Sequence, residues 1–356
     1  MKKIIIFFCI LLFLSCSLNW AKGSAPAYPH SQFSKNLLPF ELPNKQWVYI
    51  NRNGKIVIKL DPKFGDASQF SDGRAIVWQQ WKLSVIDENG QILKTTPFYN
   101  IHPFSDGLAA FTTKENGKWG FMDTKGRVVI EPQFEDYPNS FSEGLAKVNK
   151  AGQWSFIDKT GKVVIQNNSH ARPFSEGLAA QVKDNCNFYK QEKCYGFIDR
   201  SGRFVIEPQF TWAGSFSERL AAIQINGALG YIDKENKMVI KPQFQGGSDF
   251  HEGLAAVACV GSRSQCKFGY INQKGQIVIA GQFDDALPFS EGLAAVMVNR
   301  KWGFINTKGE MVIPPQYDYA DYFWGGITKV TKRQEDGEKI VSETWIDKEG
   351  KPIVVK

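Results

Sequence analysis

One phrase, Phe-Ser-Glu-Gly-Leu-Ala, recurs along this chain and constrains its fold more than any other feature. Eight copies or close variants follow one another at spacings of 33 to 42 residues. They begin at Phe70, Phe104, Phe141, Phe174, Phe216, Phe250, Phe289 and Phe323. A regular period of this length is typical of repeat proteins, in which each unit buries its apolar face against the next unit.

A second phrase alternates with the first and predicts a β-hairpin. It reads Lys-Trp-Gly-Phe-Ile-Asn, then a turn that ends in Gly, then Val-Ile-x-Pro-Gln followed by an aromatic residue, as in 118–134 and 301–317. Aromatic and β-branched residues favour strands, and Asp or Asn followed by Gly favours the turn between them. The Leu-Ala-Ala segment supplies another strand, so each repeat is predicted to be a three-stranded antiparallel meander.

These linked phrases resemble the bacterial WG (KWG) repeat family across about residues 45–356. The resemblance implies an all-β repeat protein, often exported, and it brings no catalytic residues with it. Trp47, Trp81 and Trp345 depart from the pattern because no Gly follows them. About eight to nine units are expected, with degenerate units at both ends.

The arrangement of the units is less constrained than the unit itself. A β-propeller commonly closes by combining strands from both chain ends in one blade, and here neither end lacks a strand that the other supplies. The sequence therefore favours an open, solenoid-like or superhelical array of stacked meanders. A closed β-propeller is the alternative.

The first residues are predicted to lie outside the repeat fold. Lys2 and Lys3 precede an apolar run from Ile4 to Leu14, which is too short to span a bilayer and is typical of a secretory signal. Leu14-Ser15-Cys16 resembles a bacterial lipobox, so we expect a signal peptide over 1–15 and lipidation of Cys16. Cleavage after 21–23 is the alternative. Residues 16–36 are then an anchor and flexible tether, and 37–356 are the repeat domain.

Four further cysteines form two close pairs, each within one of the two longest repeats. Because exported proteins form disulfides, we predict the pairs Cys186–Cys194 and Cys259–Cys266, each closing the base of an enlarged hairpin loop. A zinc site is the weaker alternative, because it requires cysteines from distant repeats to converge.

Little in the sequence points to catalysis or to binding of a metal, a cofactor or a nucleic acid. The Lys and Arg residues are scattered, which argues against nucleic-acid binding, and no catalytic, metal or cofactor motif is present. The four histidines hold unrelated places in the repeat and are interpreted as surface residues. An acid recurs in the repeated phrase, as at Glu143 and Glu291. Its simplest interpretation is a turn acid that binds nearby backbone N–H groups.

The favoured function is a binding module for a protein or glycan partner at the cell envelope, in a monomer held to the membrane only by its lipid anchor. Trp212 and Trp324 lie off the consensus tryptophan position and are candidates for a binding face. The alternative is a structural envelope spacer or scaffold without a discrete ligand. A glycan-active enzyme is the least favoured hypothesis, so no enzymatic activity and no cofactor are expected.

Overall fold

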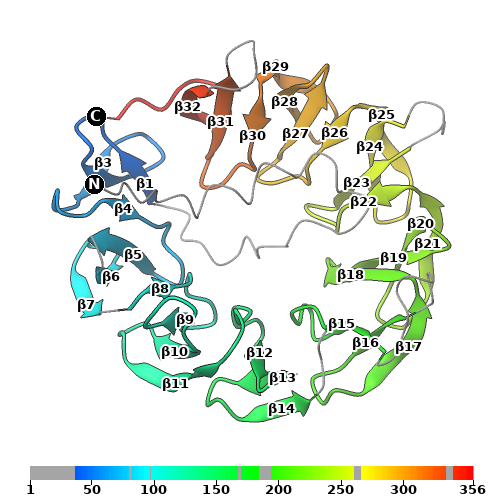
Figure 1. Ribbon diagram of the computed structural model, residues 1–356. Helices are drawn as coiled ribbons and strands as arrows, with labels where there is room; N and C mark the ends of the chain where they lie inside the picture. Colours follow the sequence, from blue (N-terminus) through cyan, green and yellow to red (C-terminus); the bar gives the residue numbers. More distant parts are fainter. Residues whose placement is uncertain are drawn as a thin grey trace, which may run out of the picture. The chain divides into compact units, whose positions relative to one another are not determined.

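The repeats close into a ring. A computed structural model describes residues 37–355, apart from 80–81, 97, 167–169, 184–193, 260–265 and 334–339. The described residues form nine antiparallel sheets, which follow one another around a centre as the blades of a β-propeller (Figure 1). The predicted open array is therefore wrong, and the closed propeller, its alternative, is the observed fold. We number the sheets blade 1 to blade 9 in chain order.

The strands of the nine blades have the following bounds. Blades 1 to 3 contain β1 (Leu38–Glu41), β2 (Trp47–Ile50), β3 (Ile56–Lys59), β4 (Asp66–Ala67), β5 (Arg74–Gln79), β6 (Lys82–Asp87), β7 (Ile92–Thr96), β8 (Asn100–Ile101), β9 (Leu108–Thr112), β10 (Trp119–Asp123) and β11 (Val128–Phe134). Blades 4 to 6 contain β12 (Leu145–Lys150), β13 (Gln153–Asp158), β14 (Val163–Gln166), β15 (Ala179–Val182), β16 (Tyr195–Ile198), β17 (Phe204–Phe210), β18 (Trp212–Ser217), β19 (Leu220–Ile225), β20 (Ala228–Ile232) and β21 (Met238–Phe244). Blades 7 to 9 contain β22 (Gly246–Gly247), β23 (Leu254–Ala258), β24 (Phe268–Asn272), β25 (Ile277–Phe283), β26 (Asp285–Ala286), β27 (Leu293–Val298), β28 (Lys301–Asn306), β29 (Met311–Tyr317), β30 (Tyr319–Ala320), β31 (Ile327–Arg333) and β32 (Ile340–Asp347).

The predicted meander is present, and a short extra strand joins it on the inner side of most blades. In blade 8, β27 pairs with β28 and β28 pairs with β29, which are the three predicted strands. The two-residue strand β26 adds to β27 and faces the centre of the ring. A strand of two residues is too short to give an alternating pattern, so the sequence did not reveal it. The described residues contain no helix long and apolar enough to cross a membrane.

Aromatic pairs fill the space between neighbouring blades. The Phe of each repeated phrase is buried, and in most copies it packs against an aromatic ring of the preceding blade. The ring centroids of Phe121 and Phe141 are 4.9 Å apart, and those of Phe304 and Phe323 are also 4.9 Å apart. Tilted and edge-to-face pairs at this separation stabilise beyond simple burial of area. The repeated Phe is therefore the residue through which one blade packs onto the previous one.

The Gly of the Trp-Gly phrase lies under the backbone of the outer strand. A Cβ atom on Gly303 would come within 2.5 Å of the Ile313 carbonyl oxygen and within 2.6 Å of the Pro315 nitrogen. The outer strand is seven residues long in the five blades that have this Gly, namely in β11, β17, β21, β25 and β29. It is only four residues long in β3, where Val48 takes the place of the Gly. The glycine thus permits the close crossing of the Pro-Gln-aromatic segment.

Each outer strand of blades 1 to 8 also contains a β-bulge. In blade 8, Phe304 pairs with Ile313 and the adjacent Ile305 pairs with Met311, which leaves Val312 as the extra residue. Met311 and Val312 are both exposed, at 43% and 39%. Bulges twist an edge strand and interrupt its hydrogen-bonding pattern. The circumference of the ring therefore carries a series of bulged edges.

The ring closes where blade 9 packs against blade 1. Leu38, Val48 and Ile50 of blade 1 form one apolar cluster with Ile327 of blade 9. Gly54, in the hairpin turn of blade 1, lies so close to the C-terminal segment that a Cβ atom there would come within 2.2 Å of the Val354 carbonyl oxygen. The turn glycine of other blades packs in the same way on the preceding outer strand, as Gly309 does on Ile279. Closure therefore uses the turn-glycine contact that other junctions also use, and it needs no shared sheet.

Candidate functional site

The repeated phrase forms a two-residue turn just before the Leu-Ala-Ala strand of each blade that carries it. Its acid and the following residue both have positive φ, as in Glu291 (56°) and Gly292 (85°), which is the geometry of a type I′ turn. Ser290 and Leu293 flank the turn and exchange backbone hydrogen bonds of 2.9 and 3.2 Å. Glycine adopts this conformation readily, whereas glutamate does so only at a cost. The glutamate is therefore held in place by contacts outside its own turn.

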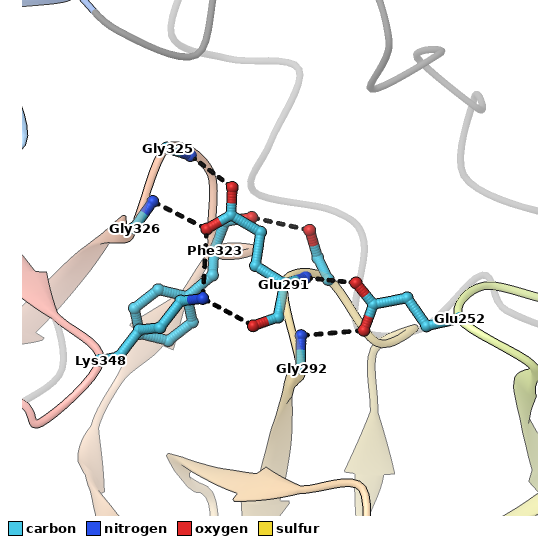
Figure 2. Close-up of polar contacts among 8 residues, drawn as sticks. Glu252, Glu291, Gly292, Phe323, Gly325, Gly326 and Lys348 are labelled. Carbon is cyan, nitrogen blue, oxygen red and sulfur yellow. Dashed lines mark hydrogen bonds and ion pairs between the residues drawn. The ribbon is translucent and has the colours of Figure 1, made fainter.

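Those contacts run to the next blade. The Glu291 carboxylate accepts hydrogen bonds of 2.7 Å from the backbone N–H groups of Gly325 and Gly326 (Figure 2). The Glu252 carboxylate accepts bonds of 2.6 and 2.8 Å from Glu291 and Gly292 in the same way (Figure 2). Equivalent bonds connect Asp72 to Gly107, Asp106 to Gly144, Glu143 to Gly177, Glu176 to Arg219, and Glu218 to Gly253. We call this set of seven contacts the acid clamps. They join every consecutive pair from blade 2 to blade 9.

Two further contacts reinforce the acid clamps. The serine hydroxyl before the acid donates to the carbonyl of the next repeated Phe, as from Ser290 to Phe323 at 2.7 Å (Figure 2). At some junctions a side chain from the next blade's hairpin turn also reaches the acid. Lys348 donates to the Glu291 carbonyl oxygen at 2.7 Å, and Lys234 forms an ion pair of 3.1 Å with Glu176. The repeated carboxylates therefore serve blade-to-blade attachment. The prediction that they bind backbone N–H groups is right, but these groups belong to the next repeat.

The copies differ in the segment before the repeated Phe, which in most blades forms the strand nearest the ring centre (Figure 1). Four positions before the repeated Phe the chain carries Asp66, Asn100, Tyr137, His170, Trp212, Gly246, Asp285 and Tyr319. Tyr137 is 63% exposed and Tyr319 is 40% exposed. We call this column the inner rim. Its mixture of aromatic, amide and acidic side chains contrasts with the constant residues of the acid clamps.

A polar cluster that crosses three blades adjoins the inner rim. The Arg172 guanidinium of blade 5 lies 5.1 Å from the centroid of the Trp212 ring in blade 6, and its Nε donates to the Ala213 carbonyl oxygen at 2.9 Å. Asp249 of blade 7 is half-buried beside Gly214, where an added Cβ atom would lie 2.9 Å from the Asp249 carboxylate. Burial raises the pKa of Asp249 to about 6, although the charge of Arg172 acts in the opposite direction. Trp212, a predicted binding residue, is therefore partly covered by Arg172.

Trp324, the other predicted binding residue, lies at the junction of blades 9 and 1. It replaces the serine of the repeated phrase and packs partly buried against the cluster of Leu38, Val48, Ile50 and Ile327. The structure does not bring Trp324 and Trp212 together, because they belong to blades 9 and 6. Every described tryptophan is at least partly buried.

The interpretation of all histidines as surface residues is wrong for His102. The residue is 3% exposed, and its ring centroid lies 3.8 Å from that of Tyr137 and 4.6 Å from that of Trp119. Burial lowers the pKa of His102 to about 3, so the imidazole is neutral at physiological pH. A lone histidine in a repeat gives no sequence signal that it replaces an apolar side chain.

The structure places one predicted cysteine pair directly. Cys259 and Cys266 form a disulfide at the loop between β23 and β24. Cys194 is buried and disulfide-bonded, while its predicted partner Cys186 lies outside the described residues. Cys16 and the signal and tether segments also lie outside them. Within the described ranges no group of three or more His, Cys, Asp or Glu residues is arranged to hold a metal ion.

Comparison with known proteins connects this geometry to a sequence family. The profile of the WG-containing repeat matches residues 47–77, 84–119, 119–154, 154–185, 195–227, 230–259, 268–302 and 302–334. No curated protein is significantly similar in sequence. A solved structure of a eukaryotic initiation factor is 9% identical and covers 90% of this chain and 94% of its own, with a TM-score of 0.60. The C-terminal WD40 domain of Sif2 is 11% identical, covering 80% and 93%, with a TM-score of 0.38. The first of these similarities supports the propeller fold and nothing beyond it.

Proposed function

Because this chain belongs to the WG-containing repeat family and closes into a propeller, we propose that it acts as a rigid, non-enzymatic scaffold at the cell envelope. The observation that supports this proposal is the set of acid clamps. Seven junctions use the same carboxylate-to-backbone contact, and charge-assisted bonds of this kind are stronger than neutral ones. The most regularly repeated charged residues therefore fix each blade to the next and make the ring rigid.

The placement at the envelope rests on the sequence. Leu14-Ser15-Cys16 after an apolar run is the basis for an exported, lipid-anchored chain, and the Cys259–Cys266 disulfide fits an oxidising compartment. Labelling cells with a radiolabelled fatty acid tests the anchor. We expect label on the wild-type protein and none on Cys16→Ala, whereas equal labelling of both would contradict lipidation at this residue.

A second candidate function, a binding module for a protein or glycan, is favoured by the inner rim. Its exposed tyrosines and the Arg172–Trp212 stack vary from blade to blade, and aromatic and arginine side chains dominate binding hot spots. This is the part of the chain in which the repeats carry individual rather than shared side chains.

A pull-down from envelope extracts separates the two functions. If the protein is a scaffold, the wild-type protein and Tyr137→Ala should retain the same proteins, and wild type should retain no additional stoichiometric partner. A partner retained by wild type, lost with Tyr137→Ala, and kept by the surface control Lys162→Ala would overturn the scaffold and establish the binding module. Circular dichroism of each variant verifies that the fold is intact.

A further inference from the structure

The junction between blades 9 and 1 lacks an acid clamp. At the position of the clamp acid, blade 9 carries Gly325, and blade 1 carries no copy of the repeated phrase. The two blades are joined by the apolar cluster around Ile327 and by the contact of Gly54 with Val354. Among the described residues this junction is therefore built differently from the seven clamped ones.

A pocket of about 530 Å³ opens at this junction. One side is the hairpin turn of blade 1, with Arg52 and Asn53, and the other is the last hairpin turn and the segment after it, with Lys348, Glu349 and Lys351. Pro352, Ile353 and Val354 provide apolar lining. Small-molecule sites have volumes of roughly 300 to 1,000 Å³, so the pocket has the size of a ligand site.

Two of the five charged side chains that line the pocket are already engaged. The Asp347 carboxylate accepts hydrogen bonds of 3.0 and 2.8 Å from the backbone N–H groups of Glu349 and Lys351. The Lys348 ammonium lies 3.5 Å from the Glu291 carboxylate. The charges left for a ligand are then two cations, Arg52 and Lys351, and one acid, Glu349. Arg52 comes from one side of the junction and Lys351 from the other.

We propose that this pocket binds a small hydroxylated acid, such as a sugar acid or sugar phosphate. Arg52 and Lys351 bind its carboxylate or phosphate, since a guanidinium matches the geometry of an oxyanion, and Glu349 accepts a hydrogen bond from a hydroxyl group. Because the ligand contacts both blades, it binds the closed ring better than an opened one and stabilises closure. This inference goes beyond the scaffold function, which needs no ligand.

Isothermal titration of the full-length protein with glucuronate and with glucose 6-phosphate tests the proposal, with neutral glucose as the control. We expect saturable one-to-one binding of at least one acid, a raised melting temperature in its presence, and no binding of glucose. Arg52→Ala and Lys351→Ala should each weaken binding about tenfold, the effect of losing one hydrogen bond between charged groups. Vesicles containing phosphatidylglycerol show whether a lipid headgroup serves as the source of the same chemistry.

The chain offers a matched control for each variant. Lys159 occupies the same turn position in blade 4 that Arg52 occupies in blade 1. Lys162 occupies the same turn position in blade 4 that Lys351 occupies in blade 9. Lys159→Ala and Lys162→Ala should bind the acid like wild type. Equal weakening in these controls, or the absence of saturable binding by either acid and by the vesicles, would overturn the proposal. Neither result bears on the scaffold, which the pull-down tests.

Discussion

At the scale of single residues, the Trp-Gly glycine shows how much of a repeat consensus is steric. Its recurrence from copy to copy is visible in the sequence, but the reason for it is a crossing strand that only the fold reveals. Gly303 lies beneath the carbonyl of Ile313, so any side chain there would displace the outer strand. The turn glycines, by contrast, could be interpreted from the sequence, because a local turn requires positive φ.

Replacing Gly303 with Ala should therefore destabilise the protein far more than an ordinary Gly-to-Ala change. The added Cβ would lie 2.5 Å from a backbone oxygen, and overpacking of this kind costs about 1–3 kcal/mol. Gly246→Ala is the matched control, because nothing lies within 4 Å of the place that its Cβ would take. Urea unfolding measures both. A similar loss of stability in the two variants would contradict the steric explanation.

Asp249 predicts a pH dependence. Its folded pKa is about 6 against an ordinary value of 3.8, so between these values the folded state binds more protons than the unfolded state. Stability contributed by this group is present below about pH 4 and falls as pH rises toward 6. Asp249→Asn removes the buried charge and should raise the free energy of unfolding by about 1–2 kcal/mol at pH 8, after allowance for solvent screening.

The gain from Asp249→Asn should disappear at pH 4, where the wild-type carboxyl is also neutral. Denaturant unfolding at the two pH values measures this gain. Asp285→Asn, in the inner rim, provides a second comparison, because burial also raises the pKa of Asp285. A pH-independent effect of Asp249→Asn would show that the substitution acts through packing rather than charge.

At the scale of structural elements, the hairpin and the Leu-Ala-Ala strand could be predicted because their signals are local: alternation, a turn and a closing glycine. The acid clamps could not, because a carboxylate's partner lies in the following repeat, as Glu218 and Gly253 show. Sequence periodicity reveals that an acid recurs, but it does not reveal which N–H groups donate to it. The inner rim could not be predicted as a set of strands, because five of its residues lie in strands of two residues and Tyr137 and His170 lie in no strand. Only Trp212, in β18, lies in a longer strand.

Removing one acid clamp should loosen one junction. Glu291→Ala leaves the N–H groups of Gly325 and Gly326 without their carboxylate, and loss of hydrogen bonds to a charged group costs about 1.5–3 kcal/mol. Glu235→Ala, in an exposed hairpin turn, should change stability by less than about 0.5 kcal/mol. Hydrogen exchange should show faster exchange in the turn 324–327 for Glu291→Ala. Unchanged exchange there would argue against the clamp.

At the scale of the whole molecule, the sequence predicted the unit but not the ring. Counting strands at the two chain ends favoured an open array, because neither end lacks a strand. Complete sheets at both ends would exclude a ring only if closure required one sheet built from both chain ends. In the structure blade 9 presents Ile353 and Val354 to Gly54 as other blades present their outer strands, so complete blades at both ends are compatible with a ring.

Closure can be tested by crowding this contact. Gly54→Val places a side chain against the Val354 backbone and should open the ring, with an increased radius of gyration in small-angle X-ray scattering. Gly227→Val is the matched control, because its φ of 77° resembles the 75° of Gly54 while nothing lies within 4 Å of its Cβ position. If Gly54→Val is less stable than Gly227→Val but has the same radius of gyration, closure of the ring does not depend on this contact.

The bulged outer strands have a consequence for association between copies of this protein. Eight open strand edges on one molecule would ordinarily be templates for polymerisation, since an unpaired edge can recruit a strand from another chain. A bulge at residues such as Val312 and Val278 puts each edge out of register with any straight partner strand. We expect this device, repeated with the blade, to limit edge-to-edge pairing between copies of the protein despite the exposed valines on its outer strands.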